Sequence, residues 1–249
     1  MTININGKII NVESSYDIVF ERLKQFEISN ENTDNKLIIN ENYILIKVDD
    51  KFIEINEKVN TTDIYPIVNN LIAYSINDKN NLYIHSVIVS KNNKGIMILG
   101  EFNSGKSTLA NAFKEKGYVI NSADQTWIYN DKLVLGSRIN VVNNEIAYLS
   151  DELTNKHVKI DKIIIIKGIC ENGKVHIEKL ENDKHYIKNI FKYANWHYDM
   201  PLLTKYTKLI DTGENIIEFL KSTKIPTYTV RGDGNKIVEV IDDRKEGFN

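Results

Sequence analysis

An eight-residue run near the middle of the chain constrains its fold more than any other feature. Residues 100–107 read Gly-Glu-Phe-Asn-Ser-Gly-Lys-Ser and fit the pattern G-x-x-x-x-G-K-[ST] without a mismatch. The apolar residues 96–99 precede this run, and apolar residues at helical spacing follow it from Leu109. This order predicts a strand, a loop and a helix, which is the context that a phosphate-binding loop requires.

The chemistry of such a loop depends on backbone more than on side chains, because successive N–H groups and the helix N-terminus converge on the phosphates. Gly100 and Gly105 permit dihedral angles and a close approach that a Cβ would block. Lys106 is expected to reach the β- and γ-phosphates, and the Ser107 hydroxyl to coordinate Mg²⁺. We therefore expect ATP and Mg²⁺ as cofactors. The residues expected to hold the nucleotide are Gly100, Asn103, Ser104, Gly105, Lys106, Ser107 and Thr108.

The composition of the chain disfavours several classes of partner. The 249 residues carry a formal net charge of −2 and no long basic block, so we expect neither nucleic acid nor an anionic membrane as partner. No apolar stretch approaches the length needed to cross a bilayer. Cys170 is the single cysteine, which excludes an internal disulfide, and no signal pattern opens the chain, so a cytoplasmic protein is expected. Cys170 follows an apolar run and is itself expected to be buried.

Residues 1–80 are expected to form a small α+β module. The alternating residues 3–10 surround Asn6-Gly7, which predicts a hairpin. Short β-type runs separated by Asn and Asp predict a meander, and two stretches show helical spacing. The expected elements after the hairpin are a helix from residue 16 to residue 23, strands at 36–40, 43–48 and 51–55, and a helix at 63–72.

Residues 81–249 are expected to form the domain that contains the loop. Gly117 is a plausible C-cap for the helix after the loop, and the long β-branched run 160–169 predicts a strand buried on both faces. The other expected elements are strands at 83–90, 95–99, 118–121, 125–129, 132–135, 138–142, 227–230 and 237–241, and helical stripes between 181 and 221.

Two polar residues near the loop are candidates for the chemistry. Asp124 lies at the carboxyl end of the strand expected after the loop helix, which is where ligands bind in open α/β sheets. A carboxylate there could accept a proton from an attacking hydroxyl or hold Mg²⁺. His85 lies in the strand before the loop strand, where a hydrogen-bonded core histidine is the alternative.

Residues 82–89, 100–107 and 117–124 together resemble, in order and spacing, the catalytic core of the bacterial HPr kinase/phosphorylase family. The resemblance covers about a fifth of the chain. It implies an α/β fold whose P-loop core, shared with ATP-dependent phosphoenolpyruvate carboxykinases, has a mixed sheet. It also implies that Asp124 acts as the base on a serine hydroxyl, that His85 lies near the transferred phosphate, and that a homo-oligomer can form.

The chain departs from that family at the position before Asp124. The family usually has two adjacent acids, and here the first is Ala123, so either Asp124 serves both purposes or a second metal ligand comes from elsewhere, with Glu101 as one source. The chain shows no counterpart of that family's glycine-containing segment associated with phosphorolysis, so the resemblance does not extend to the reverse reaction. Shorter relatives of this core occur beside biosynthetic machinery for modified peptides, and the length of this chain and its N-terminal module resemble those.

The expected function is therefore an ATP-dependent, Mg²⁺-requiring kinase that phosphorylates a hydroxyl, most simply serine, of a peptide or small protein. Two alternatives stay open. One is a nucleotide-binding sensor or scaffold with weakened catalysis, which Ala123 motivates. The other is a small-molecule kinase that uses the same site.

Overall fold

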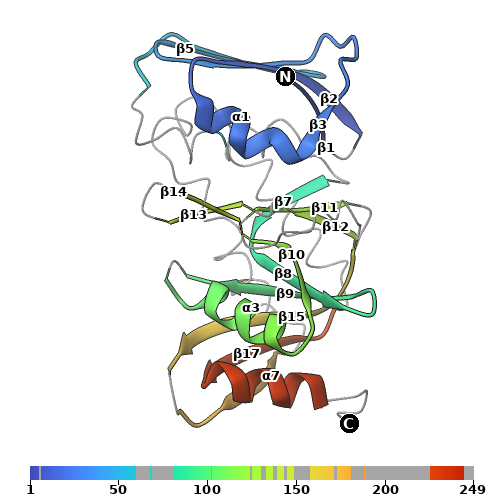
Figure 1. Cartoon of the computed structure of the whole chain (residues 1–249), viewed down its shortest axis with the longest axis vertical. Helices are drawn as coiled ribbons and strands as arrows, with labels where there is room; N and C mark the ends of the chain where they lie inside the picture. Colours follow the sequence, from blue (N-terminus) through green and yellow to red (C-terminus); the bar gives the residue numbers. More distant parts are fainter. Residues whose placement is uncertain are drawn as a thin grey trace. The chain divides into compact units, whose positions relative to one another are not determined.

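The computed structural model describes residues 1–5, 7–59, 68, 81–101, 103–123, 125–129, 133–136, 139–142, 145–148, 158–170, 173–180, 188 and 225–243. The chain divides into two compact units, one comprising Met1–Tyr83 and Asn195–Asn215, the other Ile84–Ala194 and Ile216–Asn249. The fold is mixed α/β, and each unit contains a mixed β-sheet (Figure 1).

The first unit is built on a sheet in which six of the described strands follow the order β3-β1-β2-β4-β5-β6. Its elements are β1 (Thr2–Ile5), β2 (Lys8–Ser14), α1 (Asp17–Leu23), the 3₁₀ turn η1 (Lys24–Phe26), β3 (Glu27–Ile28), β4 (Lys36–Asn40), β5 (Tyr43–Val48) and β6 (Lys51–Ile55). Strands β2 and β4 pair in parallel, and the other neighbours are antiparallel.

Alternation of apolar and polar residues determines which face of this sheet is buried. In β5 the residues Ile44, Ile46 and Val48 are buried, whereas the residues between them are partly or fully exposed. The expected hairpin, the first helix and the three-strand meander are confirmed, and Gly7 takes the positive φ of 85° that the hairpin turn requires. The helix expected at 63–72 lies outside the described residues except for Val68.

The second unit contains a larger mixed sheet, with nine of the described strands. The main path runs β10-β8-β9-β15-β12-β11-β7, and β17 pairs with both β15 and β16. Its strands are β7 (Asn81–His85), β8 (Val87–Lys91), β9 (Lys94–Gly100), β10 (Val119–Ser122), β11 (Gln125–Tyr129), β12 (Leu133–Gly136), β15 (Val158–Ile169), β16 (His176–Leu180) and β17 (Thr227–Gly232). Two further strands, β13 (Ile139–Val142) and β14 (Glu145–Tyr148), form a separate antiparallel pair.

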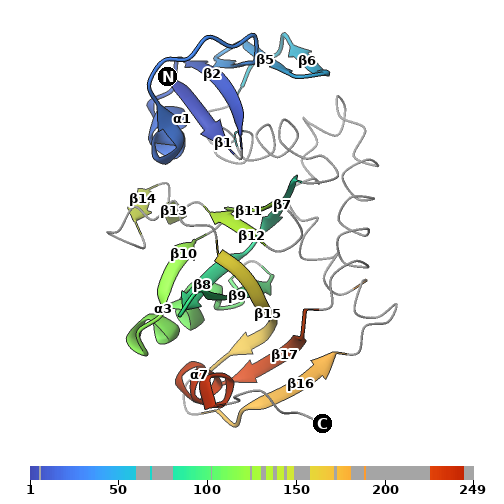
Figure 2. The same cartoon turned by 90° about the vertical axis from the view of Figure 1, so that its right-hand side faces the viewer.

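Strand β15 is the centre of this unit. It runs parallel to β9 on one side and to β17 on the other, as Figure 2 shows. Ile163, Ile164, Ile165 and Ile166 are all buried, which confirms the expected strand with two covered faces.

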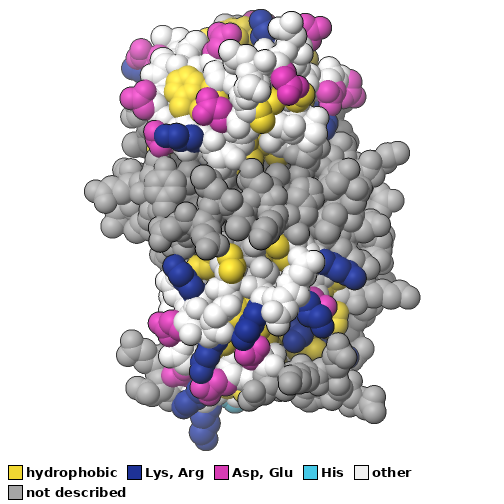
Figure 3. Space-filling view, turned by 45° about the vertical axis from the view of Figure 1, so that its right-hand side comes forward, with side chains coloured by type: hydrophobic (Ala, Val, Ile, Leu, Met, Phe, Trp, Pro, Cys, Tyr) yellow, Lys and Arg dark blue, Asp and Glu magenta, His cyan; other side chains and the backbone are white. Residues whose placement is uncertain are grey.

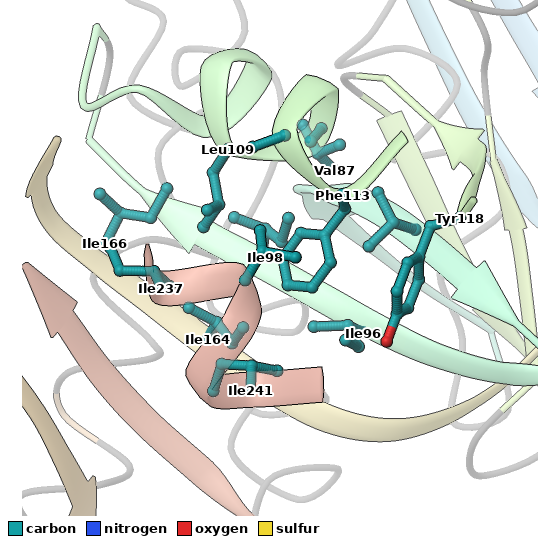
Figure 4. Packing of buried hydrophobic residues seen from close by; sticks show 14 of the residues in the cluster. Val87, Ile96, Ile98, Leu109, Phe113, Tyr118, Ile164, Ile166, Ile237 and Ile241 are labelled. Carbon is teal, nitrogen blue, oxygen red and sulfur yellow. The ribbon is translucent and has the colours of Figure 1, made fainter. Parts of the chain in front are cut away.

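Two helices, α3 (Lys106–Glu115) and α7 (Gly234–Asp243), pack against each other and against this sheet. In Figure 4 the ring of Phe113 lies among isoleucines contributed by the sheet and by α7. Tyr118 also belongs to this cluster, and the centroid of its ring lies 4.9 Å from that of the Phe113 ring in an edge-on arrangement. At about 25 cal/mol per Å² of apolar surface buried, this cluster supplies much of what holds the unit together.

Most of the strands expected between residues 83 and 169 are confirmed, with one important difference. The single strand expected at 83–90 is two strands, β7 and β8, separated by Ser86. The chain leaves the β11 side of the sheet at that residue and joins β9. The turn at Asn92-Asn93 has two positive φ angles, 52° and 62°, as a two-residue hairpin turn requires.

The C-terminal segment corrects a second expectation. Residues 237–241 were expected as a strand, but they belong to helix α7. Ile237, Val238 and Ile241 fit a helical stripe equally well, and all three are buried. The side chain of Asp233 accepts a hydrogen bond from the Lys236 N–H at 3.2 Å, which is the capping contact of a helix start.

Cys170 corrects a third expectation, because it is exposed and not buried. It follows the last residue of β15, where the chain has already left the interior. The helical stripes expected between 181 and 221 lie outside the described residues apart from Lys188. Within the described ranges, none of the helices has the length and apolar character to span a membrane.

Candidate functional site

The chain segments that carry the candidate residues meet at one edge of the second sheet. Strand β9 ends at Gly100, where the loop begins. Its neighbour β8 is antiparallel, with Val87 opposite Ile98, so the residues just before Val87 lie at the same edge. Strand β10 runs antiparallel to β8, with Ser122 opposite Ile88, so its carboxyl end returns to this edge as well. The strand register therefore brings His85 and the end of β10, through Ala123, to the same edge of the sheet as the loop.

The described residues of the loop include two left-handed backbone conformations. Asn103 and Gly105 have positive φ angles of 58° and 96°, and the Ser104 N–H donates to the Glu101 carbonyl at 3.1 Å. Gly105 is the N-cap of α3, and among the described residues no side chain caps the helix. Gly105 has no side chain with which to cap the helix, and a helix N-terminus of this kind favours an anion.

Lys106 is held inward over this loop. Its Nζ donates to the carbonyls of Gly100 at 3.1 Å and of Glu101 at 3.0 Å, and the residue is only 9% exposed. Burying an ammonium is unfavourable unless hydrogen bonds compensate, and these carbonyls provide them. The contacts place a positive charge at the start of α3, where a phosphate would also meet the helix N-terminus.

Two steric details show how closely the loop is packed. A Cβ at Gly100 would collide with the Ser104 Oγ atom, and a Cβ at Gly105 would lie 2.7 Å from the Ile169 Cγ1 atom. Both glycines are thus required by space, and Gly105 also by its φ. The Ser104 Oγ atom is buried and has no hydrogen-bond partner among the described residues. A buried hydroxyl, a lysine and a helix N-terminus together fit a phosphate group.

The other residues expected to contact nucleotide or metal are more exposed. Ser107 is half-buried in the first turn of α3, while Asn103, Thr108 and Glu101 are exposed. Across the described ranges no group of three or more His, Cys, Asp or Glu side chains gathers to hold a metal ion. Of the residues expected to hold Mg²⁺, Ser107 lies in the first turn of α3 and Glu101 lies earlier in the same loop. Asp124 lies outside the described residues.

His85 is buried at the end of β7, with 7% of its surface exposed. Asp124 lies outside the described residues, but its neighbour Ala123 is described and is buried, 3% exposed. The methyl group therefore occupies an interior position where the resembled family has an acid.

Sequence reasoning missed two features of this edge. Ile169, at the end of β15, packs directly behind Gly105. Three buried hydroxyls, those of Ser86, Ser122 and Thr126, form hydrogen bonds with one another between β8, β10 and β11. The polarity of residues 121–126 at a strand end was the available signal, but only the fold shows that Ser86 joins them.

A second polar cluster lies by the C-terminal end of α3, where the Lys91 ammonium also donates to the Lys116 carbonyl. The Tyr118 hydroxyl donates to the Asp242 carboxylate at 2.8 Å, and the Lys91 ammonium lies 3.4 Å from the other carboxylate oxygen. Burial and the Asp242 contact raise the pKa of Tyr118, and the Tyr118 hydrogen bond lowers the pKa of Asp242. These contacts attach the last turn of α7 to the sheet and have no access to the loop chemistry.

Charges of both signs are spread over the described surface, and Figure 3 shows Lys and Arg side chains among Asp and Glu side chains on the face it presents. A scan against protein-family models finds no match, and a search of curated proteins also finds none. The inference about function therefore rests on the geometry of this edge and on the sequence resemblance.

Proposed function

We propose that this protein is an ATP-dependent kinase that transfers the γ-phosphoryl group to a hydroxyl, in the first instance a serine, of a peptide or small protein. The observation that carries the proposal is the loop between β9 and α3. There Lys106 is held over the loop carbonyls while the first-turn amides of α3 have no side-chain cap among the described residues. A loop of this kind binds the phosphates of a nucleotide in P-loop enzymes.

The proposed roles of the other site residues follow from the chemical requirements of phosphoryl transfer. The acceptor oxygen forms a bond to the γ-phosphorus while the bond between that phosphorus and the β,γ-bridging oxygen breaks, and the acceptor proton must be removed. We assign that proton to the Asp124 carboxylate, which follows the end of β10 in the chain. His85 would contact the transferred group from the β7 side. Mg²⁺, when bound, supplies charge neutralisation, with Ser107 and Asp124 as its protein ligands and Glu101 as a further candidate.

The buried Ala123 favours the alternative of a nucleotide-binding sensor with weakened catalysis. One carboxylate fewer at the metal lowers the negative charge available there, so catalysis depends more on Asp124. A small-molecule kinase with the same site differs only in its acceptor. A peptide acceptor and a homo-oligomeric state both stay predictions that the resemblance implies.

Nucleotide binding is tested with Lys106→Ala. Loss of a charge-assisted contact to phosphate should weaken the binding of a fluorescent ATP analogue by about 10- to 100-fold. Lys114→Ala is the matched control, because Lys114 lies on the same helix and is exposed. Its affinity should equal that of the wild type. Equal affinities for all three proteins would overturn the assignment of the loop.

A further inference from the structure

A chain of three hydroxyls links the flanks of the two candidate catalytic residues. Ser86, directly after His85, donates from its Oγ to the Thr126 Oγ1 atom at 2.7 Å. The Thr126 Oγ1 atom in turn reaches the Ser86 carbonyl at 3.2 Å and the Ser122 Oγ atom at 2.9 Å. Ser122 and Thr126 are the second residues before and after Asp124 in the chain.

The burial of this chain makes its geometry specific. Ser86, Ser122 and Thr126 are each 0% exposed. A hydroxyl has one proton and two lone pairs, so Thr126 accepts from Ser86 and donates to one of its two acceptors at a time. Leaving a buried hydroxyl without a partner costs about 1–3 kcal/mol, so the three side chains have few alternative arrangements.

The hydrogen bonds between Ser86 and Thr126 connect β11 with the point where β7 and β8 separate. Ser86 is the break between β7 and β8, where its carbonyl receives a side-chain hydrogen bond from Thr126. The same threonine lies in β11, which follows the Asp124 segment. One residue therefore links the end of the His85 strand with the strands before and after Asp124 in the chain.

We propose that Thr126 is a positioning residue that holds the end of β10 and the start of β11, which flank Asp124 in the chain, against Ser86, the residue after His85. The proposal rests on the kinase function above. Thr126 contacts neither nucleotide nor acceptor in this assignment. It acts because its bond to Ser122 connects the start of β11 with the end of β10, and its bonds to Ser86 attach both to the point where β7 and β8 separate. A misplacement of about 1 Å in such a site can reduce the rate about 100-fold.

The test compares Thr126→Val, which removes the hydroxyl at nearly constant volume, with Thr126→Ser, which keeps it. Thr227→Val is the matched control, because Thr227 is also buried in this unit and donates to the Ile225 carbonyl at 3.1 Å. Steady-state kinetics with γ-labelled ATP and a degenerate serine-containing peptide library give kcat and the KM for ATP. Hydrogen exchange of the amides in residues 122–126 measures the local stability of this segment directly. Ser86→Ala, which removes a single hydrogen bond, is the milder variant if Thr126→Val does not fold.

We expect Thr126→Val to lower kcat by about 10- to 100-fold with KM for ATP unchanged, and to speed exchange at 122–126. Thr126→Ser should restore both, and Thr227→Val should change neither. A Thr126→Val protein with wild-type kcat, or an equal loss of kcat in Thr227→Val, overturns the proposal. Failure of the kinase function itself looks different. Wild type would then bind ATP yet label no peptide, and the catalytic part of the proposal would fall with it, while unchanged exchange in Thr126→Val would overturn the structural part as well.

Discussion

The two sheets of this protein bury different kinds of residue. In the first unit the described interior is almost wholly aliphatic, with Thr2 and Arg22 as its buried polar side chains. The second unit has more buried polar side chains, and all of them except Ser90 and Thr227 come from strand ends or from the start of α3 at the loop edge: His85, Ser86, Lys106, Asn121, Ser122 and Thr126. Burying polar groups reduces stability unless each is satisfied. Their concentration at one edge therefore indicates a site, whereas the first sheet is explained by packing.

The largest expected effect tests whether the two interiors are separable. Phe113→Ala, in α3, and Ile46→Ala, in β5, each remove a fully buried side chain. Both should lower the free energy of unfolding, by about 3–5 and about 2–5 kcal/mol respectively. Chemical denaturation measures both losses of stability. In a separate binding measurement, Phe113→Ala should also weaken ATP binding, because α3 begins in the loop. Loss of ATP binding in a folded Ile46→Ala protein would contradict the comparison.

A smaller effect is expected from glycine substitutions that share the same backbone penalty. Gly105→Ala and Gly117→Ala both place a Cβ at positive φ, 96° and 83°, at a cost of about 1–2 kcal/mol. Only Gly105 has Ile169 in the way, and at Gly117 no atom lies within 4 Å of the new Cβ. Isothermal titration should show ATP affinity reduced about tenfold or more in Gly105→Ala, since 1.4 kcal/mol is a factor of ten. Gly117→Ala should keep wild-type affinity, and a loss there would show that the effect is general strain.

The smallest effect concerns the polar cluster away from the loop. The pKa of Asp242 is lowered from 3.8, so its stabilising contribution is present above that pH and is lost as pH falls through the folded value. The pKa of Tyr118 is raised from 10.0, so its contribution is present below pH 10 and is lost as pH rises through the folded value.

Tyr118→Phe should therefore lower the free energy of unfolding at pH 7 by about 1 kcal/mol, allowing for the solvent exposure of Asp242. The difference from wild type should shrink toward both acid and strongly alkaline pH. Thermal unfolding of the two proteins from pH 3 to 11 measures it, and a constant difference across that range would contradict the pairing. ATP affinity should stay unchanged, since the cluster lies away from the loop.

Much of the fold could be predicted from the sequence wherever one signal dominated. Strands β4 to β6 have clear alternation and polar turns, and the β-branched run of β15 has no helical alternative. Helix α7 was missed because residues 237–241 are mostly apolar and β-branched, so they were expected as a strand although Ile237, Val238 and Ile241 have helical spacing. Strand β16 was not predicted, because it is mostly exposed and has little apolar pattern.

The candidate site divides in the same way. The loop could be identified because its residues are contiguous. The hydroxyl chain could not, because Ser86 and Thr126 are 40 residues apart and only the sheet brings them together. The break at Ser86 was hidden for the same reason, since its partner lies on another strand. Contacts of this kind depend on strand order, which local patterns do not encode.

The most direct test of the account uses Asp124→Asn, with transfer of labelled γ-phosphoryl to a serine-containing peptide library followed by mass spectrometry. We predict that wild type yields phosphoserine peptides, and that Asp124→Asn binds ATP as wild type does but forms product about 100-fold more slowly or not at all. Wild-type transfer rates in Asp124→Asn would contradict the account, because the acceptor proton would then not depend on this carboxylate.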